Sequence, residues 1–109
     1  MNVIIKTSRN IVIITIEGSI DSKTAGNLQS QIMETVAKTN NVLLDLSGVG
    51  YISSAGLRVL LMIYRQIKSK NGKVILVGVS EEIRDVMSIT GFINFFEITN
   101  TLENAINSF

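Results

Sequence analysis

The chain opens with two hydrophobic runs of β type that are separated by a short polar segment. The runs cover residues 2–7 and 11–17, and the polar segment is 8–10. Two runs rich in β-branched residues with so short a polar connection are typical of an antiparallel hairpin. The second run begins Ile11-Val12-Ile13-Ile14 and so has apolar side chains for both faces of a sheet. We expect it in the sheet interior, and the first run, which includes a charge, at an edge.

A helical pattern and then a buried strand follow the hairpin. Apolar residues recur at intervals of three and four between residues 25 and 36, which predicts an amphipathic helix that ends near Lys38. Residues 42–46 form a short apolar run interrupted only by Asp45, which is typical of a strand covered on both faces. The strands on either side of the helix should therefore be parallel and joined by a right-handed crossover.

The second half of the chain repeats the alternation of helix and strand. We expect Val86 and Thr90 on the inner face of a helix between Ser80 and Gly91, and Leu102 on the inner face of the helix nearest the C-terminus. The predicted elements are a helix over 54–69, a strand over 73–79, a helix capped by Ser80 and ended by Gly91, a strand over 95–98, and a helix that begins with the capping-box pair Asn100 and Glu103.

The resulting order is ββαβαβαβα, which predicts an α/β fold with a mixed sheet of about five strands and helices packed against it. A chain of 109 residues is long enough for one core and not for two, so residues 1–109 are expected to form a single domain.

Composition excludes several classes of function. Ten basic and nine acidic residues give a net charge of +1, so no long-range attraction to nucleic acid is expected. The absence of histidine removes Ser-His-Asp triads and histidine metal sites, and the absence of cysteine removes thiol chemistry. We expect no cofactor and no metal. No apolar run has the roughly 18 residues of a membrane span and no signal peptide is recognised, so a cytoplasmic protein with no membrane contact is expected.

The candidate site is a pair of serines, Ser53 and Ser54, immediately before the helix predicted over 54–69. The first N–H groups of a helix lack intrahelical partners and carry partial positive charge. A phosphoryl group on a serine at this position would find hydrogen-bond donors with little rearrangement. The local alternative is purely structural, with Ser53 as an N-cap and Ser54 as a solvated residue of the first turn.

The sequence around these serines closely resembles a known signature. The stretches Leu44-Asp45-Leu46-Ser47-Gly48-Val49 and Tyr51-Ile52-Ser53-Ser54-Ala55-Gly56-Leu57 are similar to those of bacterial anti-sigma factor antagonists, the STAS-domain family. That family usually has Asp-Ser-Ser/Thr/Ala-Gly-Leu, in which the first Ser is phosphorylated by the partner anti-sigma kinase. The resemblance implies that Ser54 is this acceptor. It also places Ser53 where the family has Asp, which leaves Ser53 as an alternative acceptor.

A second stretch, Ile16-Glu17-Gly18-Ser19-Ile20-Asp21-Ser22, resembles the family's Gly-x-Leu/Ile-Asp at the end of the second strand. Asp21 matches the acidic position, and the resemblance implies that it faces the partner. Local physics offers a helix N-cap or an Asx turn as its structural role, and either is compatible with partner contact.

The outer face of the helix over 54–69 has a stripe of its own. Arg58, Met62, Arg65 and Ser69 recur at helical spacing. Met and Arg are both favoured at protein interfaces, so Arg58 and Met62 are candidate contact residues. The alternative is that the stems of the two arginines partly cover Met62.

The resemblance implies a non-enzymatic phosphoswitch. The unphosphorylated protein would bind an anti-sigma factor serine kinase and so release a sigma factor, phosphorylation of Ser54 would abolish binding, and a phosphatase would reset the serine. The protein would be a monomer when free. The partner-binding residues are expected to be Asp21, Ser53, Ser54, Gly56, Leu57, Arg58 and Met62.

The sequence also bears on two other functions. A STAS-like module could bind a small ligand or a lipid-transport or permease partner, with Ser53 and Ser54 serving only the structure. An enzyme is disfavoured, because Asp21 or Asp45 would have to act alone as the base for Ser54.

Overall fold

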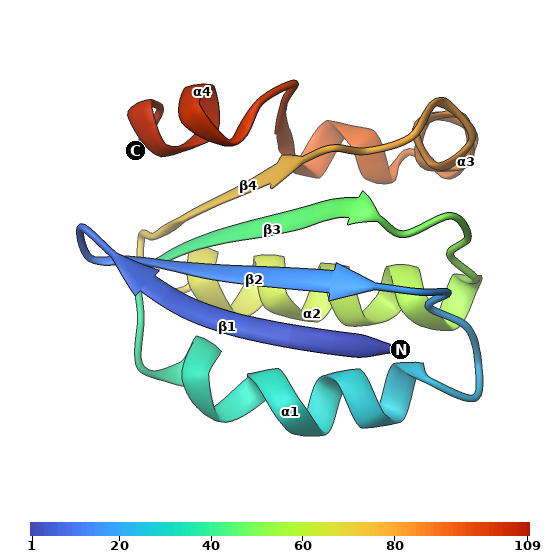
Figure 1. Cartoon of the computed structure of the whole chain (residues 1–109), viewed down its shortest axis with the longest axis horizontal. Coiled ribbons are helices and arrows are strands. Elements are labelled where there is room, and N and C mark those ends of the chain that lie inside the picture. The colour runs from blue at the N-terminus through green and yellow to red at the C-terminus, as the bar shows by residue number, and fades with distance from the viewer.

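A mixed sheet of five strands, in the spatial order β1-β2-β3-β4-β5, forms the centre of the molecule (Figure 1). The computed structural model describes residues 1–109. β1 and β2 are antiparallel, and every later neighbour pair is parallel. The strands are β1 (Asn2–Ser8), β2 (Ile11–Glu17), β3 (Asn41–Gly48), β4 (Lys73–Val77) and β5 (Glu97–Thr99).

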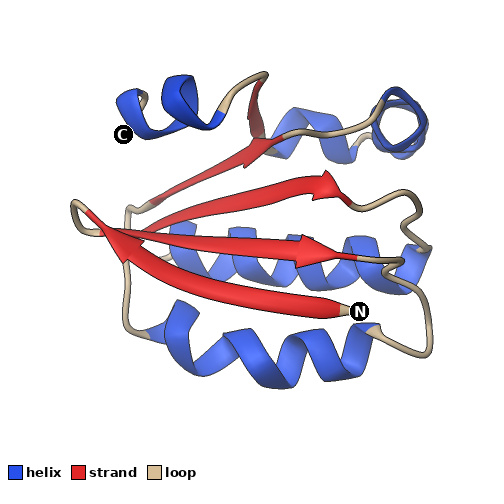
Figure 2. Ribbon diagram, in the orientation of Figure 1, coloured by secondary structure: helices blue, strands red, loops and turns tan.

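Three α-helices and one 3₁₀-helix lie between these strands along the chain, and a fourth α-helix follows the last strand (Figure 2). The order confirms the predicted ββαβαβαβα pattern and the mixed α/β sheet. None of the helices combines the length and the apolar composition needed to cross a bilayer. The helices are α1 (Ala25–Ala37), α2 (Ser54–Lys68), α3 (Glu81–Thr90), the 3₁₀-helix η1 (Phe92–Phe95) and α4 (Leu102–Asn107).

The hairpin confirms the expected edge and interior strands. Arg9 and Asn10 form its two-residue turn, with φ angles of 53° and 64°. Positive φ at both central residues matches the twist of the flanking strands, and Asn tolerates it well. β2 therefore lies between β1 and β3, with its Ile11 and Val12 both buried.

The two faces of the sheet are covered unequally. α1, α2 and α3 contribute to a cluster of 23 buried residues on one face, whereas α4 covers the other face with a cluster of 5. β3 supplies side chains to both, since Leu44 lies in the larger cluster and Leu43 in the smaller. This confirms that the apolar run interrupted by Asp45 is a central, doubly covered strand.

The last third of the chain departs from the expected boundaries. The strand predicted over 95–98 is wrong by two residues, because Phe95 ends η1 and β5 begins at Glu97. Gly91 ends α3 in the left-handed conformation, as expected, and the chain then continues as a 3₁₀ turn. That turn places Phe95 and Phe96 within 5.4 Å and 5.5 Å of the Tyr64 ring, measured between centroids. We attribute the later start of β5 to this aromatic packing against α2.

The buried faces of two helices are narrower than the sequence predicts. In α3, Ile83 and Met87 are buried, but Val86 and Thr90 are exposed, because α3 packs chiefly on η1 and not broadly on a strand. In α4, Leu102 is exposed as well.

The cap of α4 is shifted by one residue from the prediction. Thr101, and not Asn100, is the N-cap, since its Oγ1 accepts from the backbone N–H of Asn104 at 3.1 Å.

Lys73 Nζ donates to the carbonyl of Ser108 and forms an ion pair with Glu97 at 3.5 Å, which ties α4 and β5 to β4.

Gly56, in the first turn of α2, allows the helix to pack closely against the loop that follows β2. A Cβ at this position would lie 2.7 Å from Ile20 Cγ2, 2.7 Å from Ile52 Cγ1 and 2.9 Å from the carbonyl oxygen of Ile20. These distances are too short for a side chain. Gly26, in the first turn of α1, has nothing within 4 Å of the same position and serves as a matched comparison.

We expect Gly56→Ala to lower the free energy of unfolding by about 1–3 kcal/mol, because the added methyl group must displace the packed isoleucines or the backbone. Gly26→Ala should raise it by about 0.5–1 kcal/mol, since alanine fits there and favours the helix. Urea unfolding of both variants measures the difference. Equal effects of the two substitutions would contradict the close packing at Gly56.

Candidate functional site

Two loops meet at the carboxyl ends of β2 and β3, where α1 and α2 begin (Figure 1). Ile20 and Ile52 form an isolated parallel bridge between these loops. The N–H of Ile20 donates to the carbonyl of Tyr51 at 2.9 Å, and the N–H of Ser53 donates to the carbonyl of Ile20 at 2.8 Å. The structure therefore brings Asp21 and the serine pair together, although they are far apart in sequence.

The two serines have different environments. Ser53 is the N-cap of α2, with an extended backbone, and its half-buried Oγ accepts from the N–H of Gly56 at 3.3 Å. Ser54 is the first residue of the helix and is exposed, and its hydroxyl makes no hydrogen bond within the chain. The predicted N-cap is confirmed, and only the hydroxyl of Ser54 is both open to solvent and unengaged.

Asp21 organises the loop before α1. Its Oδ1 accepts from the N–H groups of Lys23 at 2.9 Å and Thr24 at 3.1 Å, which is an Asx-type turn. Both local interpretations of Asp21 are supported, because bonds from the N–H groups two and three residues on are those of an N-cap as well as of an Asx turn. The N–H of Asp21 donates back to Thr24 Oγ1 at 2.9 Å, and Thr24, the residue before α1, has a helical backbone and makes no cap bond to the helix. The N–H of Lys23 is the main cause that holds the pKa of Asp21 below its ordinary value, so the side chain is a carboxylate at neutral pH.

Two of the expected contact residues lie in the core. Gly56 is buried, and Leu57 is 3% exposed and belongs to the larger apolar cluster. The expectation that they contact a partner is corrected on this point, because neither presents surface. Leu57 begins the inner face of α2, and Gly56 is needed for the packing of Ile20 and Ile52.

The outer face of α2 begins beside the serine pair. Arg58 and Arg65 are exposed, while Met62 is partly buried. No residue of α2 is acidic. The ion pairs of the molecule, Lys38–Glu34 and Lys73–Glu97, lie elsewhere, so Arg58 and Arg65 have no acidic partner within the chain.

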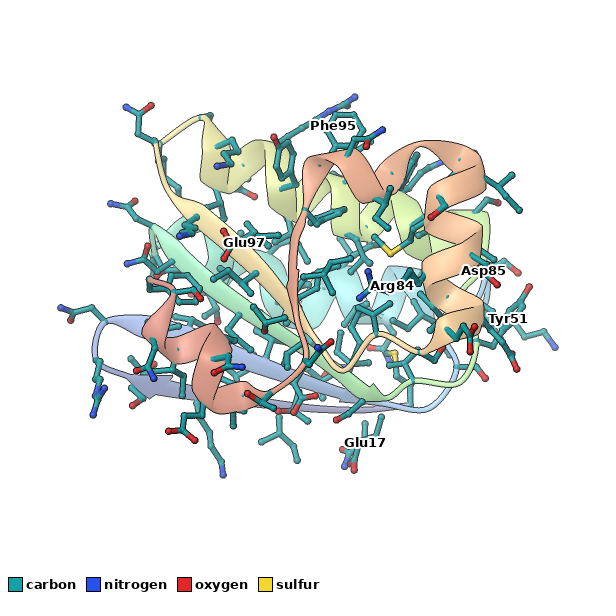
Figure 3. All side chains as sticks on the ribbon, turned by 90° about the horizontal axis from the view of Figure 1, so that it is seen from above. Glu17, Tyr51, Arg84, Asp85, Phe95 and Glu97 are labelled. Carbon is teal, nitrogen blue, oxygen red and sulfur yellow. The ribbon has the colours of Figure 1, made fainter.

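Tyr51 is an exposed residue of the serine loop that the sequence did not single out as a contact residue. It is 56% exposed although the next residue, Ile52, is buried. Figure 3 shows Tyr51 at the end of the molecule where Asp85 of α3 also lies. The available signal was an aromatic residue within a loop of Ser and Gly, because a loop of this composition has few apolar side chains that could bury it.

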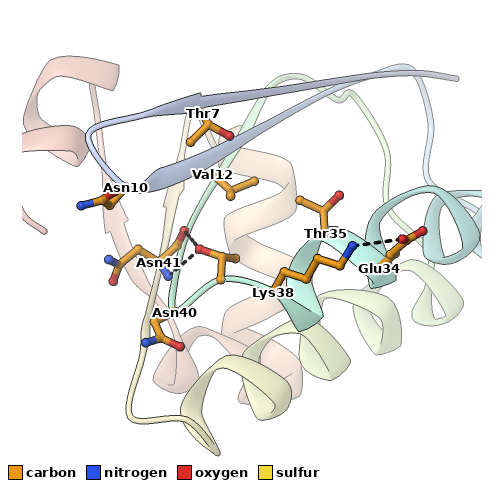
Figure 4. A pocket seen from close by; sticks show the side chains of 9 residues that line it. Thr7, Asn10, Val12, Glu34, Thr35, Lys38, Asn40 and Asn41 are labelled. Carbon is orange, nitrogen blue, oxygen red and sulfur yellow. Dashed lines mark hydrogen bonds and ion pairs between the residues drawn. The ribbon is translucent and has the colours of Figure 1, made fainter.

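Two grooves of the molecule lie away from the site. A polar groove of about 580 Å³ lies between the hairpin and the end of α1, at the opposite end of the sheet (Figure 4). Another, of about 540 Å³, lies between the hairpin turn and α4. Neither is lined by Asp21, Ser53 or Ser54. No group of three or more acidic residues comes together as a metal site would require. A site whose serine hydroxyl is exposed and outside both grooves suits contact with a protein better than capture of a small ligand.

Comparison with known sequences identifies the family of this chain. The family model for the STAS domain matches residues 2–105. The chain is 34% identical over 100 residues to BtrV of Bordetella bronchiseptica, which is assigned as an anti-sigma factor antagonist, and the match covers 91% of this chain and 86% of BtrV. It is 26% identical over 106 residues to the anti-sigma-B factor antagonist of Bacillus subtilis, covering 97% of each chain.

Solved structures agree in fold. An assigned anti-sigma factor antagonist of Thermotoga maritima superimposes with a TM-score of 0.92 at 25% identity, covering 97% of this chain and 92% of that one. The unphosphorylated form of the anti-sigma factor antagonist SpoIIAA superimposes with a TM-score of 0.79 at 19% identity, covering 98% and 96%, and supports the fold alone. The resemblance seen in the serine loop is thereby confirmed, and the chain belongs to the STAS-domain family of anti-sigma factor antagonists.

Proposed function

We propose that this protein is a phosphoswitch whose unphosphorylated form binds an anti-sigma factor serine kinase, and whose phosphorylation at Ser54 abolishes that binding. The observation that supports it most is the Ser54 hydroxyl, which is exposed and unengaged at the start of α2. The neighbouring Asp21 loop and the exposed Arg58 complete a surface that a protein partner can cover.

The same geometry favours Ser54 over Ser53 as the acceptor. A kinase must reach the hydroxyl oxygen, and that of Ser53 is half-buried and occupied by the N–H of Gly56.

Electrostatics explains how the phosphoryl group would act. It adds about −1.5 to −2 charges beside the carboxylate of Asp21, which is already ionised. In an interface this group must lose its water, and it repels any acidic group on the partner. Binding is then lost without a change of fold, and the protein needs no catalytic machinery of its own.

The proposal defines the partners. The anti-sigma factor kinase contacts Asp21, Ser54, Arg58 and Met62, and a phosphatase resets the serine. The free protein is a monomer. Because these partners act in the cytoplasm, the proposal places the protein there.

Substitution of Ser54 tests the switch. We expect Ser54→Ala to bind the cognate kinase as the wild type does, and Ser54→Asp to bind at least tenfold more weakly, which corresponds to about 1.4 kcal/mol. Ser30→Asp adds the same charge at an exposed position in the middle of α1 and should bind normally. Titration calorimetry against each anti-sigma kinase of the source organism measures the affinities. Equal binding by all four proteins would rule out the switch.

Phosphopeptide mapping tests the acceptor. After incubation with ATP and the kinase, we expect one phosphoryl group, on Ser54, which is lost in Ser54→Ala and retained in Ser53→Ala. Modification of Ser53 instead would move the acceptor by one residue. If a kinase that binds the protein and is active leaves it unmodified, a STAS module with a small-ligand or permease partner becomes the better function.

A further inference from the structure

Arg58 lies one helical turn after Ser54 and has no ionic partner. Ser54 is the first residue of α2 and Arg58 the fifth, and both side chains are exposed. The ion pairs of the molecule involve Lys38 and Lys73 and no arginine. A free guanidinium is thus present on the same helix as the proposed modification site.

Helix geometry directs the two side chains toward each other. Residues four apart lie on one face with about 5–6 Å between their Cβ atoms. The Cα–Cβ bonds of a helix tilt toward its N-terminus, so the Arg58 side chain leans over the turn that contains Ser54. An acidic group placed four residues before a basic one is also the more favourable orientation of such a pair.

Competing charges near Arg58 are few. α2 has no acidic residue in any of its turns. Asp21 lies across the loop contact, but its Oδ1 accepts from the N–H groups of Lys23 and Thr24, and it forms no ion pair. In the unphosphorylated protein the guanidinium therefore stays available to a partner.

We propose that the Arg58 guanidinium forms an ion pair with the phosphate of phosphorylated Ser54. This intramolecular pair makes Arg58 unavailable to the partner. The inference rests on the proposed function for the site of modification. Transfer of the γ-phosphoryl group of ATP forms the Oγ–P bond at Ser54, breaks the bond to ADP and releases the hydroxyl proton. A guanidinium binds such a group through two parallel hydrogen bonds, and these charge-assisted bonds are stronger than neutral ones.

Phosphorylation then lowers the affinity for the partner in two ways. It adds negative charge to the surface and engages a positive side chain of that surface. Both effects weaken a partner that presents acidic groups to α2, and neither requires the core to move.

The test needs neither a kinase nor a partner. Phosphoserine is incorporated at position 54 during translation, and the second pKa of its phosphate is measured by ³¹P NMR titration. We expect this pKa to be below the ordinary value of about 6 in the wild type. Arg58→Gln should raise it by at least about 0.3, whereas Arg65→Gln, two turns further along α2, should leave it unchanged. Arg58→Lys should restore part of the shift, because lysine keeps the charge and loses the fork of donors.

Every other charged and titratable group, including Asp21 of the facing loop and Asp85 of α3, is the same in the wild type and in the variants at position 58, so the comparison isolates that side chain. The same pKa in the wild type and in Arg58→Gln would overturn the inference. That outcome would leave the binding switch at Ser54 intact, because the switch is measured separately with Ser54→Asp. Conversely, a raised pKa in Arg58→Gln together with equal binding of Ser54→Asp would support the pair and overturn the proposed function.

Discussion

The backbone bridge between the loop after β2 and the loop after β3 is the constraint on which the site depends. The N–H of Ser53 donates to the carbonyl of Ile20, and Gly56 leaves no gap beneath that contact. The bridge continues the parallel pairing of β2 and β3 beyond the ends of the strands. Asp21 and Ser54 are therefore held in a fixed relation by main-chain bonds, which a change of surface charge does not break.

A rigid base suits a switch that acts through charge. Ile20, Ile52 and Leu57 are all buried directly under the two loops and belong to the larger apolar cluster. A phosphoryl group on an exposed hydroxyl above this base changes the electrostatic surface, while the packed side chains below keep their positions. The partner then distinguishes two charge states of one fold.

The distribution of charge on α2 supports the same mechanism. The helix has basic residues on its outer face and no acid to neutralise them, although the whole chain has a net charge of only +1. The grooves lie at the hairpin, at the opposite end of the sheet. The surface beside Ser54 thus offers an interface with local charge, and the rest of the molecule supplies the scaffold.

Local sequence determined most of the elements, because hairpin turns, helix periodicity and caps depend on near neighbours. The interior position of β2, the doubly covered β3, the cap at Ser53 and the end of α3 at Gly91 all followed from such patterns. The aromatic run of residues 92–96 has no period of its own, so only its packing on Tyr64 decided where η1 ends and β5 begins.

The site divided in the same way. The signature around the serines pointed to Ser54 and Asp21, but it could not show that Gly56 faces inward, since the closest contacts of Gly56 include Ile20 in a distant loop. Which of the two serine hydroxyls is free followed from local sequence, because a cap at Ser53 engages its hydroxyl and leaves that of Ser54 in solvent. Sequence by itself determined the residues of the site, and the packing between two loops determined that Gly56 is buried.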